Sequence, residues 1–149
     1  MQAYGPAVLR LAVGVIFVAH GAQKLFGIWG GPGLSGTAGF MGQLGLGPGF
    51  PLAILVGLVE FVGGLMLITG ALTLFAALAL AFTMAVAIWK VHLANGFFLP
   101  AGYEYTVALL GALICLMLTG PGAFSIDGRR ARSAEAEAYG RARLRAGKV

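Results

Sequence analysis

Residues 7–27 constrain the fold most, because they are apolar for long enough to cross a bilayer as a helix yet contain ionisable side chains. Arg10 and Lys24 are basic, and His20 and Gln23 lie between them in the sequence. A charge at the centre of a membrane helix costs roughly 2.5–3.5 kcal/mol on insertion scales unless it is paired or hydrated. We therefore expect other helices to supply partners for these groups.

One face of this predicted helix combines basic and small side chains. At about 100° per residue, five residues fall on a single stripe: Arg10, Gly14, Phe17, Gly21 and Lys24. Glycine lets a neighbouring helix approach closely in lipid, where packing and hydrogen bonds drive helix association. The stripe is therefore predicted to face the interior of the protein.

The composition and the order of the segments predict an all-α membrane protein. The chain is 59% hydrophobic and 10% charged, and its mean hydropathy is +0.91. Transmembrane helices are predicted at about 7–27, 51–70, 72–94 and 103–119. The glycine-rich stretch after the first of them predicts a short interfacial or re-entrant helix at about 35–46. The expected fold is a four-transmembrane-helix bundle over residues 1–126, with this short helix between the first two spans.

A basic tail follows the last apolar segment. Residues 127–149 hold seven Lys and Arg against Asp127, Glu135 and Glu137, a net charge of +4. The positive-inside rule assigns such a segment to the cytoplasm, and four spans then place both termini there. The two longer loops would face outward, and the tail would contact anionic lipids.

Several functional classes are disfavoured by the sequence. The basic tail lacks interleaved aromatic residues apart from Tyr139, which argues against nucleic acid. Cys115 is the single cysteine, so neither an intrachain disulfide nor a thiolate metal site is expected, and we expect a small buried side chain there. A bis-histidine haem is disfavoured because His92 counts as roughly 8 Å shallower than His20. No metal site is predicted.

Polar side chains are expected to converge on the outer half of the bundle. The candidate ligand-binding or proton-relay residues are His20, Gln23, Lys24, Glu60, Lys90, His92 and Glu104. In one interpretation Glu60 and Glu104 pair with Lys24 and Lys90 and only fix the register of the helices. In the other, the cluster lines an outward-opening pocket that accepts a quinone-like or small anionic molecule, or relays protons. Arg10 is expected to snorkel to the cytoplasmic surface.

Short motifs along residues 7–128 keep an order and spacing that is specific as a set. They are HGAQKLFG at 20–27, GTAGF at 36–40, LGLGP at 44–48, EFVGG at 60–64, Val91-His92, Glu104 and GPGAFSID at 120–127. With these motifs the chain resembles the DoxX family of small four-helix membrane proteins.

The resemblance implies a multi-pass protein of the bacterial inner membrane. The family is named after a subunit of an archaeal terminal oxidase and thiosulfate:quinone oxidoreductase system, and related members are linked to membrane redox or detoxification assemblies. We therefore expect a subunit or anchor of a quinone-linked redox system with partner subunits, and leave open whether the chain itself catalyses a step. The alternatives are a transporter of small solutes or protons, against which no inverted repeat is visible, and a structural assembly factor without a ligand.

Overall fold

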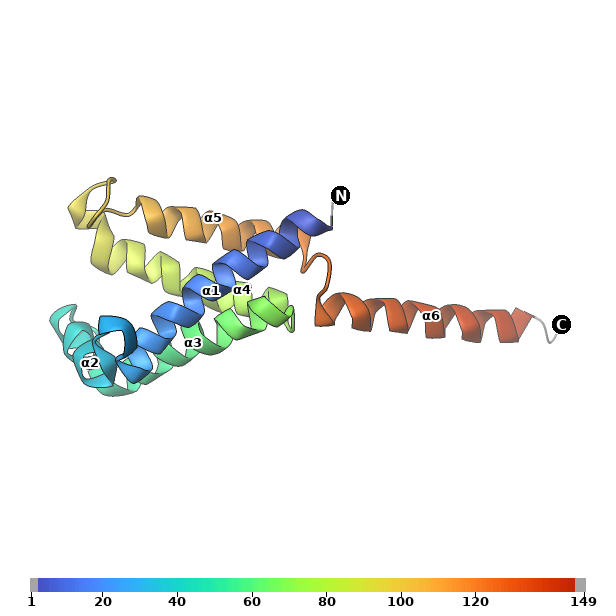
Figure 1. Cartoon of the computed structure of the whole chain (residues 1–149), viewed down its shortest axis with the longest axis horizontal. Helices are drawn as coiled ribbons and strands as arrows, with labels where there is room; N and C mark the ends of the chain where they lie inside the picture. The colour runs from blue at the N-terminus through green and yellow to red at the C-terminus, as the bar shows by residue number, and fades with distance from the viewer. Residues whose placement is uncertain (1–2, 147–149) are drawn as a thin grey trace.

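The computed structural model describes residues 3–146, and all regular secondary structure in that range is helical. The main helices are α1 (Tyr4–Phe26), α2 (Gly33–Gln43), α3 (Gly49–Thr69), α4 (Thr73–Ala87), α5 (Glu104–Thr119) and α6 (Ile126–Ala146) (Figure 1). A 3₁₀ turn, η1 (Ile28–Gly30), precedes α2. The chain of α4 continues as a π-helical turn, η2 (Ile88–His92), and a 3₁₀ turn, η3 (Leu93–Asn95). Residues 147–149 of the expected tail lie outside the described residues.

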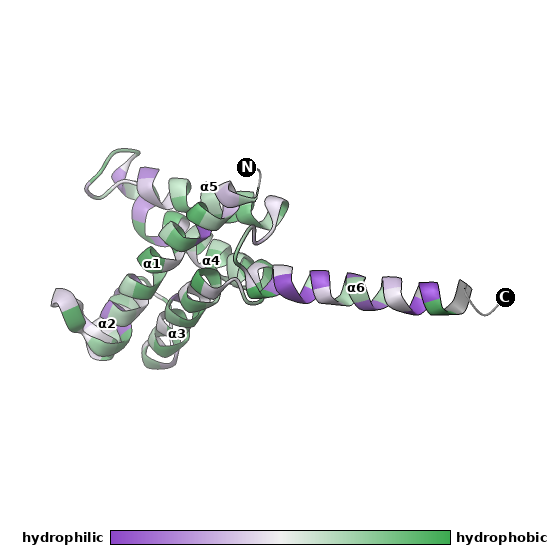
Figure 2. Ribbon diagram, turned by 45° about the vertical axis from the view of Figure 1, so that its right-hand side comes forward, coloured by the Kyte–Doolittle hydropathy of each residue, from purple (hydrophilic) through white to green (hydrophobic). Residues whose placement is uncertain are grey.

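Within the described part of the chain, three helical segments are long and apolar enough to cross a membrane: α1, α3 and the continuous stretch Thr73–Asn95. Helix α5 is also apolar but has 16 residues. The outward faces of these helices carry large exposed apolar side chains such as Val15, Phe75 and Leu118, as a bilayer requires. Hydrophobic residues predominate along the four helices, whereas hydrophilic residues are frequent in α6 (Figure 2). Cys115, expected to be buried, is exposed on α5, because that face of α5 has no helix against it.

Helix α1 packs along α3 through two pairs of glycines. Gly14 and Gly21 on α1, and Gly57 and Gly64 on α3, are each seven residues apart. A Cβ atom on Gly64 would lie 2.7 Å from the carbonyl oxygen of Gly14 and 2.7 Å from the amide nitrogen of Val18. The backbones therefore touch, and the predicted inward orientation of the first helix's small and basic stripe is confirmed by the burial of its first four members.

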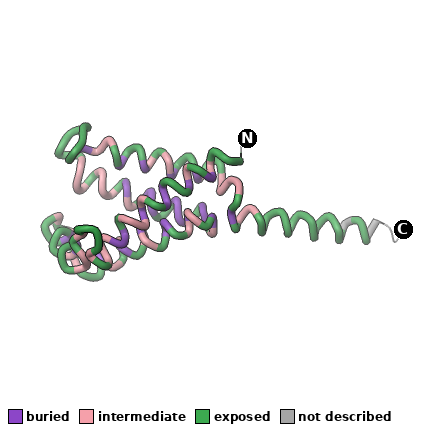
Figure 3. Tube along the Cα trace, in the orientation of Figure 1, coloured by how far each residue is buried: buried purple, intermediate pink, exposed green. Residues whose placement is uncertain are grey.

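The four apolar helices form two pairs, α1 with α3 and α4 with α5 (Figure 1). The pairs meet at the end from which α6 leaves, which we call the α6 end, and diverge toward the end that carries α2, which we call the α2 end. Buried side chains from both pairs fill the junction, among them Phe17, Leu67, Leu80, Leu113 and Leu116. Helix α6 projects away from the bundle and is exposed along most of its length (Figure 3).

The sequence suggested that Arg10 snorkels to a surface, and this expectation is wrong. The residue is buried at the α6 end, where it is 1% exposed. Its Nη1 donates hydrogen bonds of 2.9 Å to the carbonyl oxygens of Leu67 and Ile68, and its Nη2 donates to that of Ala123 at 3.2 Å. The last carbonyls of a helix lack partners within the helix and carry partial negative charge. The end of α3 is therefore a ready acceptor, and Arg10 is satisfied inside the protein.

Asp127 fixes the start of α6 to the turn between α3 and α4. Its two carboxylate oxygens accept hydrogen bonds from the amides of Leu72 (2.9 Å) and Thr73 (2.8 Å), and its own amide donates to the carbonyl of Gly70 (2.9 Å). Partial burial acts to raise the pKa of Asp127, but the bonds from Thr73 and Leu72 and the charge of Arg130 outweigh it and hold the pKa below its ordinary value. The carboxylate thus caps α4 in its ionised form.

The contact between α1 and α3 can be tested by adding one methyl group. Gly64→Ala places the methyl against backbone atoms of α1, and overpacking of this kind costs about 1–3 kcal/mol. Gly111→Ala is the matched control, because nothing lies within 4 Å of its Cβ position on α5. We expect Gly64→Ala to lower the thermal midpoint in detergent and Gly111→Ala to leave it unchanged or raise it. Equal midpoints for the two variants would contradict the close packing.

The cap formed by Asp127 predicts a pH dependence of stability. Because its folded pKa is depressed below the ordinary 3.8, its stabilising effect is present above that value and is lost as the pH falls through the folded pKa. The difference in melting temperature between the wild type and Asp127→Asn should therefore be greatest near neutral pH and shrink below pH 3.8. Glu135→Gln on the exposed part of α6 is the control and should change nothing; a difference independent of pH would refute the ionised cap.

Candidate functional site

An ion pair between a buried glutamate and a partly buried lysine links α1 and α3 toward the α2 end. The Nζ of Lys24 lies 2.5 Å from Oε2 of Glu60, and the side chains are 24% and 4% exposed. Gly21 precedes Lys24 by about one helical turn and Gly57 precedes Glu60 by the same spacing, so both backbones are close where the charges meet. Glu60 alone would be a costly buried carboxylate, and Lys24 supplies the compensating charge.

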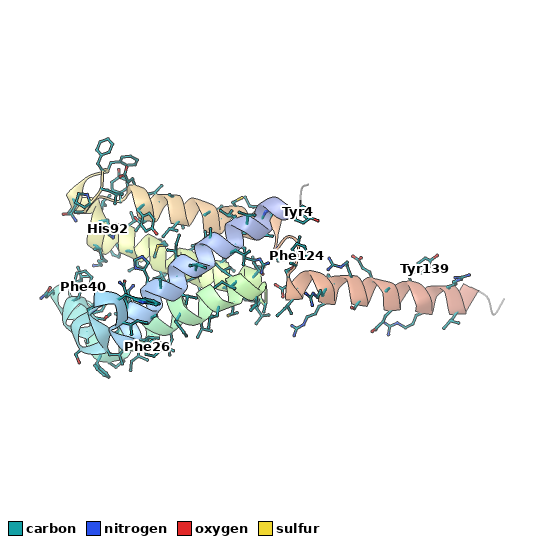
Figure 4. The ribbon with its side chains drawn as sticks, viewed as in Figure 1. Tyr4, Phe26, Phe40, His92, Phe124 and Tyr139 are labelled. Carbon is teal, nitrogen blue, oxygen red and sulfur yellow. The ribbon has the colours of Figure 1, made fainter. Side chains whose placement is uncertain are left out.

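A cavity of about 800 Å³ occupies the space between the two diverging helix pairs. Residues of α1, α2, α3, α4, η2 and α5 line it, and most of the lining side chains are apolar. Phe40 of α2 and His92 of η2 lie on opposite sides of the gap (Figure 4). The polar members of the wall are His20, Gln23, Lys24, Thr37, Glu60, Thr83, Lys90, His92, Tyr105 and Thr106.

Six of the seven sequence-predicted site residues line this cavity. The structure places two of them on the π-helical turn η2: Lys90, whose Nζ lies 4.2 Å from the centroid of the Trp89 ring, and His92. Nδ1 of His92 is 2.8 Å from the carbonyl oxygen of Ala101, which can only accept, so Nδ1 donates and Nε2 is left to accept in the neutral ring. Short π-helical segments are frequent at functional sites.

The remaining predicted residues divide between the cavity and a loop. His20 is exposed on α1 and faces the cavity, while Nε2 of Gln23 donates to the carbonyl of Trp29 at 3.4 Å and ties η1 to α1. Glu104 does not line the cavity; its Oε1 accepts a 2.8 Å hydrogen bond from the amide of Leu99. The expected pairing of Glu104 with a lysine is absent from the described residues. The loop before α5 folds back instead, and a backbone amide of that loop donates a hydrogen bond to the carboxylate.

Sequence reasoning did not identify the apolar side of this site. Phe82 on α4 lines the cavity and Phe75 does not, although they are seven residues apart and share one face of the helix. No sequence pattern separates them, because the divergence of α4 from α3 decides which of them borders the cavity. The change to a π-helical turn at Ile88–His92 was also missed.

The cavity can bind an amphipathic ligand. The Lys24–Glu60 pair is neutral overall, and with His20 it places donors and acceptors on one wall of an otherwise largely apolar space. Within residues 3–146 no three His, Cys, Asp or Glu side chains gather as a metal ion would need. The side chains of the polar wall offer hydrogen bonding and proton exchange.

These features define a polytopic membrane protein with an ion pair in the wall of an intramembrane cavity. The profile of the DoxX family matches residues 5–93, which include every predicted site residue except Glu104. The chain belongs to the DoxX family.

Two of the protein's relatives are similar to it along most of this chain. It is 32% identical over 123 residues to "Putative oxidoreductase CatD" of Bacillus subtilis (strain 168), which covers 83% of this chain and 84% of that protein. It is 33% identical over 129 residues to "Inner membrane protein YqjF" of Escherichia coli (strain K12), covering 85% and 92% respectively. No solved structure matches the chain.

Single and double substitutions can test whether the ion pair stabilises the fold by compensating the buried charge of Glu60. Lys24→Met leaves Glu60 buried without its partner, a change that costs up to about 3–5 kcal/mol for a buried pair. Replacing both residues, as Lys24→Met with Glu60→Leu, removes the orphaned charge and should recover most of the lost melting temperature. Lys90→Met is the control, because Lys90 forms no ion pair among the described residues. If the double variant melts no higher than Lys24→Met, the pair is not the source of the penalty.

Proposed function

We propose that this protein is an inner-membrane subunit or anchor of a redox system and that its cavity binds a quinone, with the ring against His20 and the Lys24–Glu60 pair. Membership of the DoxX family supports a membrane role. Two relatives are named "Putative oxidoreductase CatD" and "Inner membrane protein YqjF", and these names favour the redox role and the compartment. In this proposal partner subunits supply the electrons.

The distribution of polarity in the cavity is the observation that supports a quinone best. Its volume of about 800 Å³ falls within the 300–1,000 Å³ typical of small-molecule sites. A quinone ring carries carbonyl oxygens that accept hydrogen bonds, which Lys24 and His20 can donate, and the rest of the molecule is apolar. A small inorganic anion fits less well, because Glu60 already neutralises Lys24 and most of the wall offers no donors.

The polar wall also offers groups for proton exchange. A bound quinone accepts two electrons and two protons. Glu60 and Lys24 are hydrogen-bonded to each other, and His20 lines the same cavity. These three side chains would pass protons to and from the ring oxygens.

The proposed topology completes this assignment. Helix α5 would be the fourth span, although 16 residues at ~1.5 Å each reach roughly 24 Å, so the bilayer would thin locally around it. Helix α2 would lie at the outer interface, and both termini and α6 at the cytoplasmic side. Residues 1–126 would then form the transmembrane domain, and basic residues near the start of α6, such as Arg129 and Arg130, would meet anionic lipid headgroups.

The proposal is tested by titrating the purified protein with a short-tailed benzoquinone. Lys24→Met removes a donor to the ring, and Glu60→Gln removes the carboxylate that holds Lys24 in place. Losing a charge-assisted hydrogen bond costs about 1.5–3 kcal/mol, so each variant should raise the Kd by roughly tenfold or more. Glu104→Gln is the matched control, because the structure places Glu104 outside the cavity, and its Kd should be unchanged.

Two results would overturn the proposal. One is a wild-type protein that neither binds the quinone nor yields quinone on lipid extraction. The other is a Kd that neither cavity variant changes. Solute flux into liposomes without any redox partner would instead favour a transporter.

A further inference from the structure

The cavity is open along its side as well as at the α2 end. Leu55 of α3 and Phe82 of α4 both line it, yet they are 57% and 72% exposed. Side chains that border a cavity and are also exposed mark an opening to the outside. The opening lies between the halves of α3 and α4 nearest the α2 end, and we call it the α3–α4 crevice.

The crevice begins where the two helices stop touching. A Cβ atom on Gly63 would lie 3.1 Å from Cγ of Leu80, so α3 and α4 are in close contact at that level. The part of α4 that lines the cavity begins at Ala79, and Phe82 and Val86 continue it toward the α2 end. The divergence of α4 from α3 therefore begins near this level.

The surroundings of the crevice are hydrocarbon rather than water. Exposed side chains on the neighbouring surface of both helices are large and apolar, among them Leu58 and Val62 on α3 and Phe75 and Leu78 on α4. Both helices belong to segments that are long and apolar enough to cross a membrane. A guest that passes through this opening therefore comes from the bilayer and never leaves an apolar medium.

We propose that the α3–α4 crevice is a lateral portal through which a long-tailed isoprenoid carrier enters from the bilayer, and that its tail stays in the crevice against Leu55 and Phe82. This inference rests on the proposed function, because the ring at the end of that tail is the quinone assigned to His20, Lys24 and Glu60. The cavity is larger than one ring fills, at about 800 Å³, which leaves room for the first units of a tail. The occupant is thus a lipid-soluble carrier and not a water-soluble analogue.

The experiment compares two benzoquinones that share one ring, the first without a tail and the second with a ten-carbon tail. For the wild type we expect the tail to tighten binding by roughly tenfold or more, given the gain from burying methylene groups. Phe82→Ala should cut this advantage by roughly fivefold and leave the Kd of the tailless quinone within twofold.

The chain offers a close control for this measurement. Phe75→Ala removes the same side chain from the same face of α4, at 66% exposure, but outside the cavity. Partition of the tailed quinone into detergent micelles affects both variants equally, so it does not alter the comparison between them. Phe75→Ala should retain the full gain in affinity that the tail gives the wild type. Because both phenylalanines are mostly exposed, neither substitution is expected to unfold the protein.

The outcomes separate the two claims. Suppose that the tailless quinone binds and that Glu60→Gln weakens this binding. If the tail then improves the affinity of Phe82→Ala as much as that of the wild type, or does not improve the affinity of the wild type at all, the portal is overturned and the proposed function stands. If the wild type binds neither quinone, both fail.

Discussion

The two basic side chains of α1, Arg10 and Lys24, find their main partners on α3, and the rest of the bundle follows from this constraint. Arg10 donates to the last carbonyls of α3 at one end, and Lys24 pairs with Glu60 toward the other. Between them, glycines bring the backbones into contact. Leaving either charge unpaired in hydrocarbon would cost several kcal/mol, so α1 and α3 cannot separate along most of their length.

The second helix pair has no such tie at the α2 end. Helices α4 and α5 pack on the first pair near the α6 end, where Gly63 admits Leu80 and where Asp127 and Arg10 bind the connecting segments. Beyond that level the pairs diverge, and the ion pair becomes part of a cavity wall instead of being sealed in a core. One interaction therefore serves two purposes, because the pair that holds α1 against α3 also presents its polar atoms to the cavity.

The sequence predicted the features that depend on local periodicity and on the cost of charge. The inward face of the first helix followed from the spacing of its glycines and basic residues alone. Counting residues along the helices did not predict the partners of Arg10 and Glu104, because backbone groups bind both side chains. Arg10 donates to carbonyls at the end of α3, and Glu104 accepts from an amide in the loop before α5. The cavity's apolar side and the helical tail could not be predicted, since the first depends on how two helix pairs diverge and the second has no apolar face. The roles assigned to the site residues stay predictions.

The divergence of the two helix pairs is the central claim, and paired spin labels in lipid bilayers measure it most directly. In a Cys115→Ser background, one label pair at Gly39 and Phe98 spans the α2 end, and another at Val8 and Leu118 spans the α6 end; all four positions are exposed. The account predicts a clearly longer distance for Gly39–Phe98 than for Val8–Leu118. Equal distances, or a shorter one at the α2 end, would show a closed bundle and contradict it.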